Sequence, residues 1–250
     1  MISKSRIKLI QSLRLKKYRQ KYHLFVAEGE KCIRTLLDHA IYDLDQLYAI
    51  SSWIENNETR VSTEKANICT NEELKKLSFL KNTPPVVGVF HLNEEDISTI
   101  KTCTSAIFLD DVQDPGNVGT IIRIADWYGV DTVIRSVDSA DFYNPKVVQS
   151  SMGSIGHVKL ITLDKSELSD HLVDWSMIGA SMSPDQHSEA SFSADTCLVI
   201  GNEGKGISSE IASSLTRTIH IRGDQDRQAD SLNAAISTGI LAQHIWGQQL

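Results

Sequence analysis

The chain has 250 residues, of which 41% are hydrophobic and 23% are charged, and its formal net charge is -7. These proportions are typical of a globular protein and argue against a disordered chain. No apolar run approaches the roughly eighteen residues of a membrane span. The basic N-terminal segment also lacks the apolar block of a secretory signal. We therefore expect a cytoplasmic protein without a membrane segment.

Neither sulfur nor carboxylate clusters predict a metal site. The four cysteines lie far apart, form no Cys-x-x-Cys pair and have no histidine at a spacing suited to zinc, so we predict reduced thiols. The acidic residues Asp110, Asp111 and Asp114 lack further ligands at a suitable spacing. We expect loop and capping roles for these carboxylates and no metal.

The N-terminal segment is strongly basic. Residues 1–31 carry nine lysines and arginines against two glutamates, a balance of +7, so the rest of the chain carries -14. A basic arm on an acidic body suits docking to RNA phosphates, because each neutralised phosphate releases counterions. A solvated basic helix without a ligand explains the same pattern equally well. The residues expected to contact RNA are Lys4, Arg6, Arg14, Lys16, Lys17 and Arg19.

Helical and strand-like patterns alternate after this arm and predict a small α/β domain. Within residues 25–39, apolar side chains at Cys32, Ile33, Leu36 and Leu37 recur at helical spacing. Further predicted elements are a strand over residues 45–51, a helix that begins with a capping box of Thr70 and Glu73, and a strand over residues 84–92.

The remainder of the chain predicts a larger α/β domain. Compact β-type runs alternate with helical patterns, which favours a parallel sheet covered on both faces. The predicted division is a first domain over residues 1–92, a polar linker over residues 93–105 and a second domain over residues 106–250. The β-type runs are residues 106–112, 131–137, 157–162, 176–181, 196–201 and 216–222.

The first loop of interest is "DVQDPGNVGTIIRIADWYG", residues 111–129. Asn117 is a good helix N-cap, and the apolar residues that follow supply a stripe that faces the core. Arg123 lies off that stripe. Taken alone, this position indicates a solvent-facing residue or a partner for Asp126.

Two further loops are rich in glycine or small residues. In "LVIGNEGKGIS", residues 198–208, the glycines match neither common nucleotide-binding pattern, so they indicate close backbone approach to some other ligand. Glu203 either points into a site or caps the next helix. In "DSLNAAISTGILAQHIW", residues 230–246, Ser231 is placed as an N-cap, and by itself the pattern indicates only a closely packed helix.

Together, in this order, the motifs "NVGTIIRIADWYG", "IGNEGKGIS" and "SLNAA" resemble those of the SpoU/TrmH family of RNA 2′-O-ribose methyltransferases, in the SPOUT superfamily. The resemblance covers residues 106–246. Residues 1–92 are similar to the family's N-terminal substrate-binding domain, of the ribosomal-protein-L30e type. The implied fold is an α/β domain with a parallel sheet and a deep trefoil knot, an exception to the rule against threaded chains.

The resemblance also implies a cofactor, a site and an assembly. S-adenosyl-L-methionine would be held in the knot, largely by backbone groups, and the family acts as homodimers on RNA. Because a guanidinium is a poor base, Arg123 is expected to orient the ribose 2′-hydroxyl and the adjacent phosphate. The positions that match cofactor contacts are Gly201, Ile221 and Leu232, and those that match polar catalytic residues are Asn117, Glu203, Ser231 and Asn233.

The leading hypothesis is therefore methylation of a ribose 2′-oxygen in structured RNA, either tRNA or rRNA. One alternative is an RNA-binding or ribosome-assembly protein that has this fold without catalysis. The matching polar residues count against it. Another is a base-specific SPOUT methylase, but the Asn and Arg of the first motif favour ribose.

Overall fold

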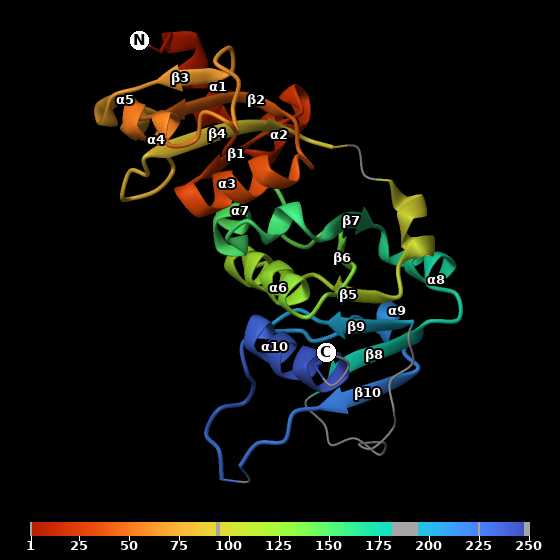
Figure 1. The fold of residues 1–250 in the computed structure, drawn as a ribbon. Helices are drawn as coiled ribbons and strands as arrows, with labels where there is room; N and C mark the ends of the chain where they lie inside the picture. Colours follow the sequence, from red (N-terminus) through yellow and green to blue (C-terminus); the bar gives the residue numbers. More distant parts are fainter. Residues whose placement is uncertain (1, 94–95, 182–194, 225, 248–250) are drawn as a thin grey trace. The chain divides into compact units, whose positions relative to one another are not determined.

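The computed structural model describes residues 2–93, 96–181, 195–224 and 226–247 (Figure 1). The chain splits into two compact units, which we describe separately. Unit 1 comprises residues 1–94 and 141–157, and unit 2 comprises residues 95–140 and 158–250. The predicted domain boundaries at residues 92 and 106 stay a prediction.

Unit 1 is built on a four-stranded mixed sheet in the order β1-β4-β2-β3. β4 is antiparallel to both β1 and β2, whereas β3 is parallel to β2. The strands are β1 (Leu24–Glu28), β2 (Leu44–Ala49), β3 (Ala66–Ile68) and β4 (Val86–His91). The helices are α1 (Lys4–Ser12), α2 (Lys16–Tyr22), α3 (Glu30–His39), α4 (Ser51–Glu55), α5 (Asn71–Leu77), α7 (Pro145–Ser151) and the short η2 (Ser154–Gly156).

The basic N-terminal segment forms two helices, α1 and α2. The side chain of the buried Arg19 donates hydrogen bonds to backbone carbonyl oxygens at the turn between them. Arg19 donates from Nη1 to the carbonyl oxygens of Leu13 and Arg14, at 2.8 Å each. These carbonyls have no partner within α1 itself, as at any helix C-terminus. The predicted capping box of Thr70 and Glu73 at the start of α5 is confirmed.

Unit 2 is built on a six-stranded parallel sheet in the order β10-β8-β9-β5-β6-β7. Each of the six predicted β-type runs forms one of these strands, so the predicted parallel sheet is confirmed. The strands are β5 (Ser105–Leu109), β6 (Thr132–Ser136), β7 (Lys159–Leu163), β8 (Ser176–Ser181), β9 (Thr196–Ile200) and β10 (Arg217–His220).

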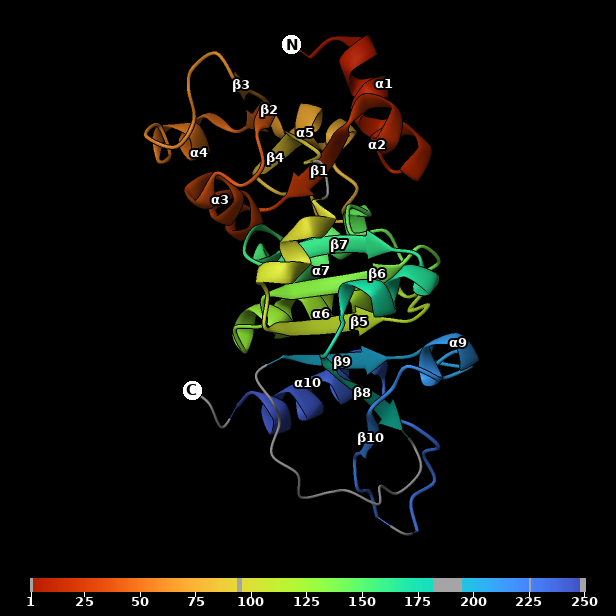
Figure 2. The same cartoon turned by 90° about the vertical axis from the view of Figure 1, so that its right-hand side faces the viewer.

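Helices cover this sheet (Figure 2). α6 (Pro115–Trp127) packs against α10 (Ala234–Ile245), and these two helices also contact β6 and β9, respectively. A separate core cluster joins side chains of the strands to those of the shorter helices. These helices are η1 (Ile97–Thr102), α8 (Leu168–His171) and α9 (Ser209–Ala212), and the short η3 (Lys165–Glu167) directly precedes α8. The trefoil knot stays a prediction.

Two predicted N-caps are wrong. Asp114 caps α6 in place of Asn117, and its carboxylate accepts from the backbone amide of Asn117 at 3.0 Å. Pro115 suits the first helical position because it has no N–H to satisfy, which makes the preceding residue the cap. Asn233 caps α10 in place of Ser231, because its side chain reaches the backbone amide of Ala235 at 2.9 Å.

Within the described part of the chain, every helix is too short or too polar to cross a membrane.

Candidate active site

Three polar side chains from three separate loops form one hydrogen-bonded chain in unit 2. Asn233 donates from Nδ2 to Oδ1 of Asn117 at 2.9 Å. Asn117 donates from its own Nδ2 to Oε1 of Glu203 at 2.8 Å. Asn117 lies in the first turn of α6, Glu203 follows β9, and Asn233 caps α10. The structure therefore brings the three predicted loops together.

The capping pattern explains why Asn117 can join these loops. Asp114 already satisfies the amides at the start of α6, which leaves the Asn117 side chain available. An ionised carboxylate only accepts hydrogen bonds, so the Asn117 amide nitrogen must face Glu203. Its oxygen then faces the donor of Asn233. Glu203 thus contacts Asn117, whereas the helix cap at Ser208 involves no side-chain hydrogen bond.

Arg123 lies exposed on α6, as predicted. It shares one face of the helix with Thr120 and Trp127, which stand three residues before it and four after it. Among the residues that the structure describes, none forms a hydrogen bond or ion pair with the Arg123 guanidinium. Ser231 is also exposed, on the segment before α10. The catalytic roles of Arg123 and Ser231 stay predictions.

The loop after β9 is closed so tightly that only glycine fits at position 201. A Cβ built on Gly201 would lie 2.4 Å from the backbone carbon of Gly206 and from the backbone nitrogen of Ile207. Asn202 and Gly206 exchange two backbone hydrogen bonds, of 3.0 and 2.9 Å. Gly206 has a positive φ of 71°, a conformation that favours glycine.

Asn202 holds this loop and was missed in the sequence. Its Oδ1 accepts from the backbone amides of Gly204 and Lys205 at 2.9 and 3.0 Å. Its Nδ2 donates to the carbonyl oxygen of Asp111 at 2.8 Å. The available signal was an Asn before a glycine-rich turn, a position where Asn side chains often bond nearby amides.

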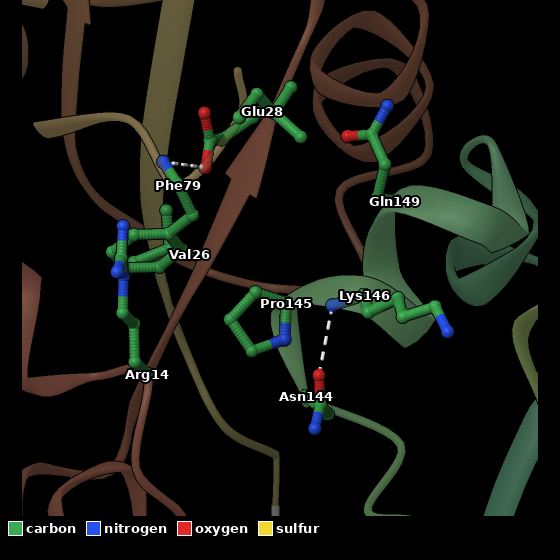
Figure 3. A pocket seen from close by; sticks show the side chains of 9 residues that line it. Arg14, Val26, Glu28, Phe79, Asn144, Pro145, Lys146 and Gln149 are labelled. Carbon is green, nitrogen blue, oxygen red and sulfur yellow. Dashed lines mark hydrogen bonds between the residues drawn. The ribbon is translucent and has the colours of Figure 1, made fainter. Parts of the chain in front are cut away.

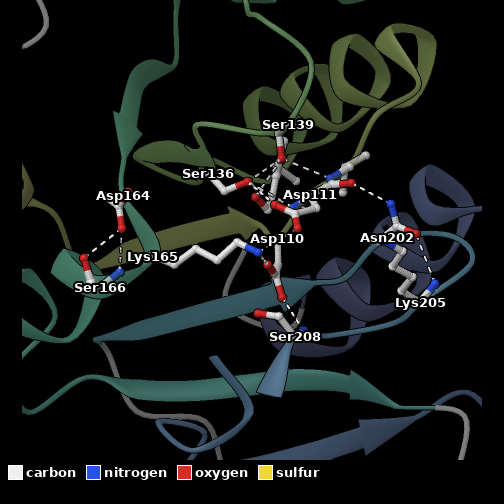
Figure 4. A network of polar contacts seen from close by, with 12 residues as sticks. Asp110, Asp111, Ser136, Ser139, Asp164, Lys165, Ser166, Asn202, Lys205 and Ser208 are labelled. Carbon is white, nitrogen blue, oxygen red and sulfur yellow. Dashed lines mark hydrogen bonds and ion pairs between the residues drawn. The ribbon is translucent and has the colours of Figure 1, made fainter. Parts of the chain in front are cut away.

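An ion cluster of Asp110, Asp111 and Lys165 supports the same loop (Figure 4). Asp110 is only 1% exposed and accepts from the Ser208 backbone amide at 2.6 Å. Lys165 places its Nζ 2.9 Å from Asp110 Oδ1 and 2.6 Å from Asp111 Oδ2. Loop roles were predicted for the two aspartates, whereas the contribution of Lys165, which follows a different strand, was not predicted.

Attraction between Lys165 and the two aspartates holds this cluster together. Burial opposes ionisation of Asp111, but hydrogen bonds from Lys165 and Ser136 outweigh it and lower the pKa of Asp111. Burial likewise opposes the charged form of Lys165, yet the two carboxylates raise the pKa of Lys165. A set of two anions and one cation is thus held at the carboxyl ends of β5 and β7.

The three predicted cofactor positions lie in loops at the same edge of the sheet. Gly201 follows β9, Ile221 follows β10, and Leu232 precedes α10 with its side chain exposed. Backbone atoms fill the place that a Cβ would take at Gly201, and Ile221 and Leu232 have apolar side chains. This set suits a ligand that is held by backbone and apolar contacts. Their contact with a cofactor stays a prediction.

Two of the predicted RNA-binding arginines are already engaged within unit 1. Arg19 is 2% exposed and forms an ion pair with Asp141. Arg6 donates to Tyr48 Oη at 2.8 Å and forms an ion pair with Asp45. We therefore remove both guanidiniums from the expected RNA surface. The predicted residues that remain exposed are Lys4, Arg14, Lys16 and Lys17, and Lys21 on α2 joins them.

The fold and the site define a class of protein. It is a parallel α/β protein in which three polar loops converge at the carboxyl ends of the strands, where such sheets bind ligands. Residues 104–243 match the model of the SpoU rRNA Methylase family, and residues 4–88 match the MRM3-like substrate binding domain. The chain therefore belongs to the SpoU rRNA methylase family, which confirms the predicted resemblance.

Two relatives span most of the chain. This chain is 26% identical over 250 residues to the 23S rRNA (guanosine(2553)-2'-O)-methyltransferase RlmP of Bacillus subtilis (strain 168). The match covers 97% of this chain and 96% of that protein. The chain is 30% identical over 229 residues to the 23S rRNA (uridine(2479)-2'-O)-methyltransferase of Streptomyces viridochromogenes, covering 85% and 76%. The structure of an AdoMet-bound rRNA methyltransferase from Sinorhizobium meliloti matches with a TM-score of 0.86 at 25% identity, covering 100% and 97%.

Proposed function

We propose that this protein methylates a ribose 2′-oxygen of RNA with S-adenosyl-L-methionine as the methyl donor. The bond between the methyl carbon and the sulfonium sulfur breaks, a bond from that carbon to the 2′-oxygen forms, and the hydroxyl proton leaves. The products are S-adenosylhomocysteine and a 2′-O-methylated nucleotide. The chain of hydrogen bonds from Asn233 through Asn117 to Glu203 supports this proposal most directly.

Gly201, Ile221 and Leu232 would hold the cofactor, which supplies an electrophilic methyl group when bound. The closed loop from Gly201 to Gly206 offers a rigid backbone for this purpose. Asp110 and Asn202 hold that loop by hydrogen bonds, so they are positioning residues in this account.

Arg123 would orient the 2′-hydroxyl and the adjacent phosphate. Its guanidinium carries a permanent charge and offers donors in a planar fork, the geometry that phosphate oxygens accept. Because a charged guanidinium is a poor base, we assign the proton to a substrate phosphate oxygen or to water.

The remaining polar residues would fix the position of the nucleophile. Methyl transfer needs the oxygen aligned behind the carbon–sulfur bond, so positioning contributes much of the rate. Asn117, Glu203 and Asn233 form one continuous chain that limits one another's rotation. Ser231 lies two residues before Asn233 and would contribute its hydroxyl to the same site.

We further propose ribosomal RNA of the large subunit as the substrate, with a cytoplasmic location. Both relatives named above carry 23S rRNA activities in their names, which supports rRNA over tRNA. The exposed lysines of α2 provide a surface for RNA phosphates. All four cysteines are free and buried, in keeping with a reducing compartment.

A homodimer is the proposed assembly. α6 and α10 pack side by side and together expose large apolar side chains, the kind of patch that marks an interface. Trp127 is 79% exposed on α6, and Ile240 is 44% exposed on α10. A second copy of the same surface would cover this patch with two-fold symmetry. Arg123 lies on this face of α6, so a dimer would enclose its guanidinium.

The proposal is tested by incubating the protein with labelled S-adenosyl-L-methionine and total RNA. Wild type should transfer label to RNA, and Arg123→Ala should lose transfer while it still binds the cofactor. Lys101→Ala, which removes an exposed charge of unit 2 elsewhere, is the matched control and should keep full activity. RNA binding without any transfer by wild type would favour the assembly protein instead.

A further inference from the structure

Unit 1 contains a pocket that the proposed methyl-transfer site does not include (Figure 3). Its volume is about 350 Å³. This value lies at the lower end of the range for small-ligand sites, roughly 300–1,000 Å³. Residues that are distant along the chain line it, among them Arg14, Val26, Glu28, Phe79, Pro145 and Lys146.

The buried polar group of this pocket is the carboxylate of Glu28, at the end of β1. Glu28 is 6% exposed. Its Oε1 accepts from the backbone amide of Phe79 at 2.8 Å, and its Oε2 accepts from Ser78 Oγ. Of the residues that the structure describes, these two alone donate to it. An ionised carboxylate accepts about four hydrogen bonds, so it has capacity for two donors from a ligand.

The surroundings of Glu28 favour a ligand that donates hydrogen bonds. Burial raises the pKa of Glu28, against the effect of its two hydrogen bonds and of the charge of Arg14. A ligand with two N–H groups would replace the water that the buried carboxylate has lost. A ligand with acceptor groups at that position would be repelled.

The walls and rim favour a flat ring that carries phosphates. The guanidinium carbon of Arg14 lies over the Phe79 ring, 4.6 Å from its centre, so the two side chains form one wall of the pocket. Pro145 faces them from the start of α7, and the side chain of Lys146 is directed away from the Phe79 ring (Figure 3). Arg14 is an exposed cation at this rim, where it can meet a phosphate next to a bound base.

We propose, on the basis of the proposed RNA substrate, that this pocket binds one unpaired guanine of that RNA. Glu28 accepts from N1–H and from the 2-amino group, which are neighbouring donors on the pairing edge of guanine. Adenine and cytosine present one donor beside an acceptor, and uracil presents one donor between two acceptors, so none of them satisfies both carboxylate oxygens. Unpaired bases expose this edge in RNA loops. The bound guanine need not be the methylated nucleotide.

The test measures binding of the full-length protein to labelled five-nucleotide RNA strands at one salt concentration. The strands are UUGUU, UUAUU, UUCUU and UUUUU, with a fifth in which inosine replaces the guanine. We expect UUGUU to bind about tenfold more tightly than the other standard strands, the discrimination of a good bidentate contact. Inosine lacks the 2-amino group and should lose most of that preference. Equal affinity for all five strands would overturn the proposal.

A variant tests the role of the carboxylate itself. Glu28→Gln should lose the preference for guanine and keep the wild-type affinity for UUUUU. Glu72→Gln, at an exposed position of α5, is the matched control and should keep the preference. A full preference in folded Glu28→Gln would overturn the proposal, and if that variant does not fold, the inosine comparison in wild type decides.

The methyl-transfer assay separates this proposal from the proposed function. Protein that transfers methyl groups without preferring guanine contradicts the pocket alone. Protein that prefers guanine but transfers nothing supports the pocket and contradicts the proposed function alone.

Discussion

Asn233 donates a side-chain hydrogen bond to Asn117 across 2.9 Å, although the two residues lie 116 positions apart in the chain. The bond joins the N-cap of α10 to the first turn of α6, and Asn117 extends it to Glu203. Each of these side chains is polar and accessible, so hydrogen bonding to one another is their alternative to hydrogen bonding with water. Their convergence at one sheet edge is the structural basis of the proposed site.

Two substitutions of Asn233 distinguish its role as the N-cap of α10 from its hydrogen bond to Asn117. Asn233→Asp keeps a good N-cap but cannot donate to Asn117, so its melting temperature should stay near wild type while methyl transfer falls about tenfold to a hundredfold. Asn233→Ala should lose the same activity and also about 1 kcal/mol of stability, because the cap is gone. Thermal melts and rates on one RNA preparation check both. Wild-type turnover by Asn233→Asp would show that the bridge is unimportant.

Two glycines of the same loop give a matched pair. The added methyl group of Gly201→Ala would lie 2.4 Å from backbone atoms of Gly206 and Ile207, so the loop must shift. We expect its affinity for S-adenosyl-L-methionine to fall by more than about tenfold, a cost of about 1.4 kcal/mol or more. Gly204→Ala meets its nearest atom only at 3.6 Å and should bind normally. Calorimetric titration measures both, and equal affinities would remove Gly201 from the cofactor site.

The dimer surface is tested by two exposed β-branched residues of unit 2. Ile240→Glu places a charge on the α10 face and should give a monomer in analytical ultracentrifugation, with methyl transfer lost. Val173 is 64% exposed and lies outside α6 and α10, so Val173→Glu should stay dimeric and active. A dimer that survives Ile240→Glu would place the interface elsewhere.

Paired lysines test the RNA surface. The double variant Lys16→Ala, Lys17→Ala should reduce the slope of log affinity against log salt by about two units, one for each lost phosphate contact. The double variant Lys75→Ala, Lys76→Ala removes the same charge from exposed positions of α5. If both pairs change the slope equally, net charge rather than α2 governs RNA binding.

The ion cluster of Asp110, Asp111 and Lys165 predicts how the free energy of unfolding depends on pH. The lowered pKa of Asp111 means that its contribution to stability is present above its ordinary value of 3.8 and is lost as pH falls through the lower folded value. Lys165→Met leaves the buried Asp110 and the partly exposed Asp111 without their cation, which should cost about 3 kcal/mol at neutral pH. Protonation of Asp111 removes one of the two charges left without the cation, so the deficit should shrink as the pH is lowered toward 4.

Urea unfolding at a series of pH values measures this difference. Lys101→Met, at an exposed position, should remain within about 0.5 kcal/mol of wild type throughout. A Lys165→Met deficit that is the same at every pH would argue for lost packing rather than lost charge pairing.

Much of unit 2 is predictable because its signals are local. The six strands are short β-type runs, and the stripe of Val118, Ile121 and Ile122 faces the core as its helical spacing predicts. The three loops stand out by their glycine and polar residues. The identity of the caps was not predictable in the same way, because Asp114, Asn117, Ser231 and Asn233 are all good capping residues and tertiary contacts select among them.

Other parts of the site depend on contacts that leave no local trace. Lys165 bonds Asp111 although the two lie 54 residues apart, so the local sequence around either residue does not predict the pair. Arg19 belongs to a basic run like its neighbours, yet it is buried against Asp141, 122 residues away. Charge in a sequence thus predicts a basic surface, but the fold decides which cations remain available to RNA.

The position of the methyl group in the product tests the central claim most directly. RNA methylated by the purified protein is hydrolysed with alkali, which cleaves beside every free 2′-hydroxyl, and the labelled products are separated. We predict that the label appears in an alkali-resistant dinucleotide, because a methylated 2′-oxygen cannot attack its phosphate. Label recovered on the base of a mononucleotide would contradict the account.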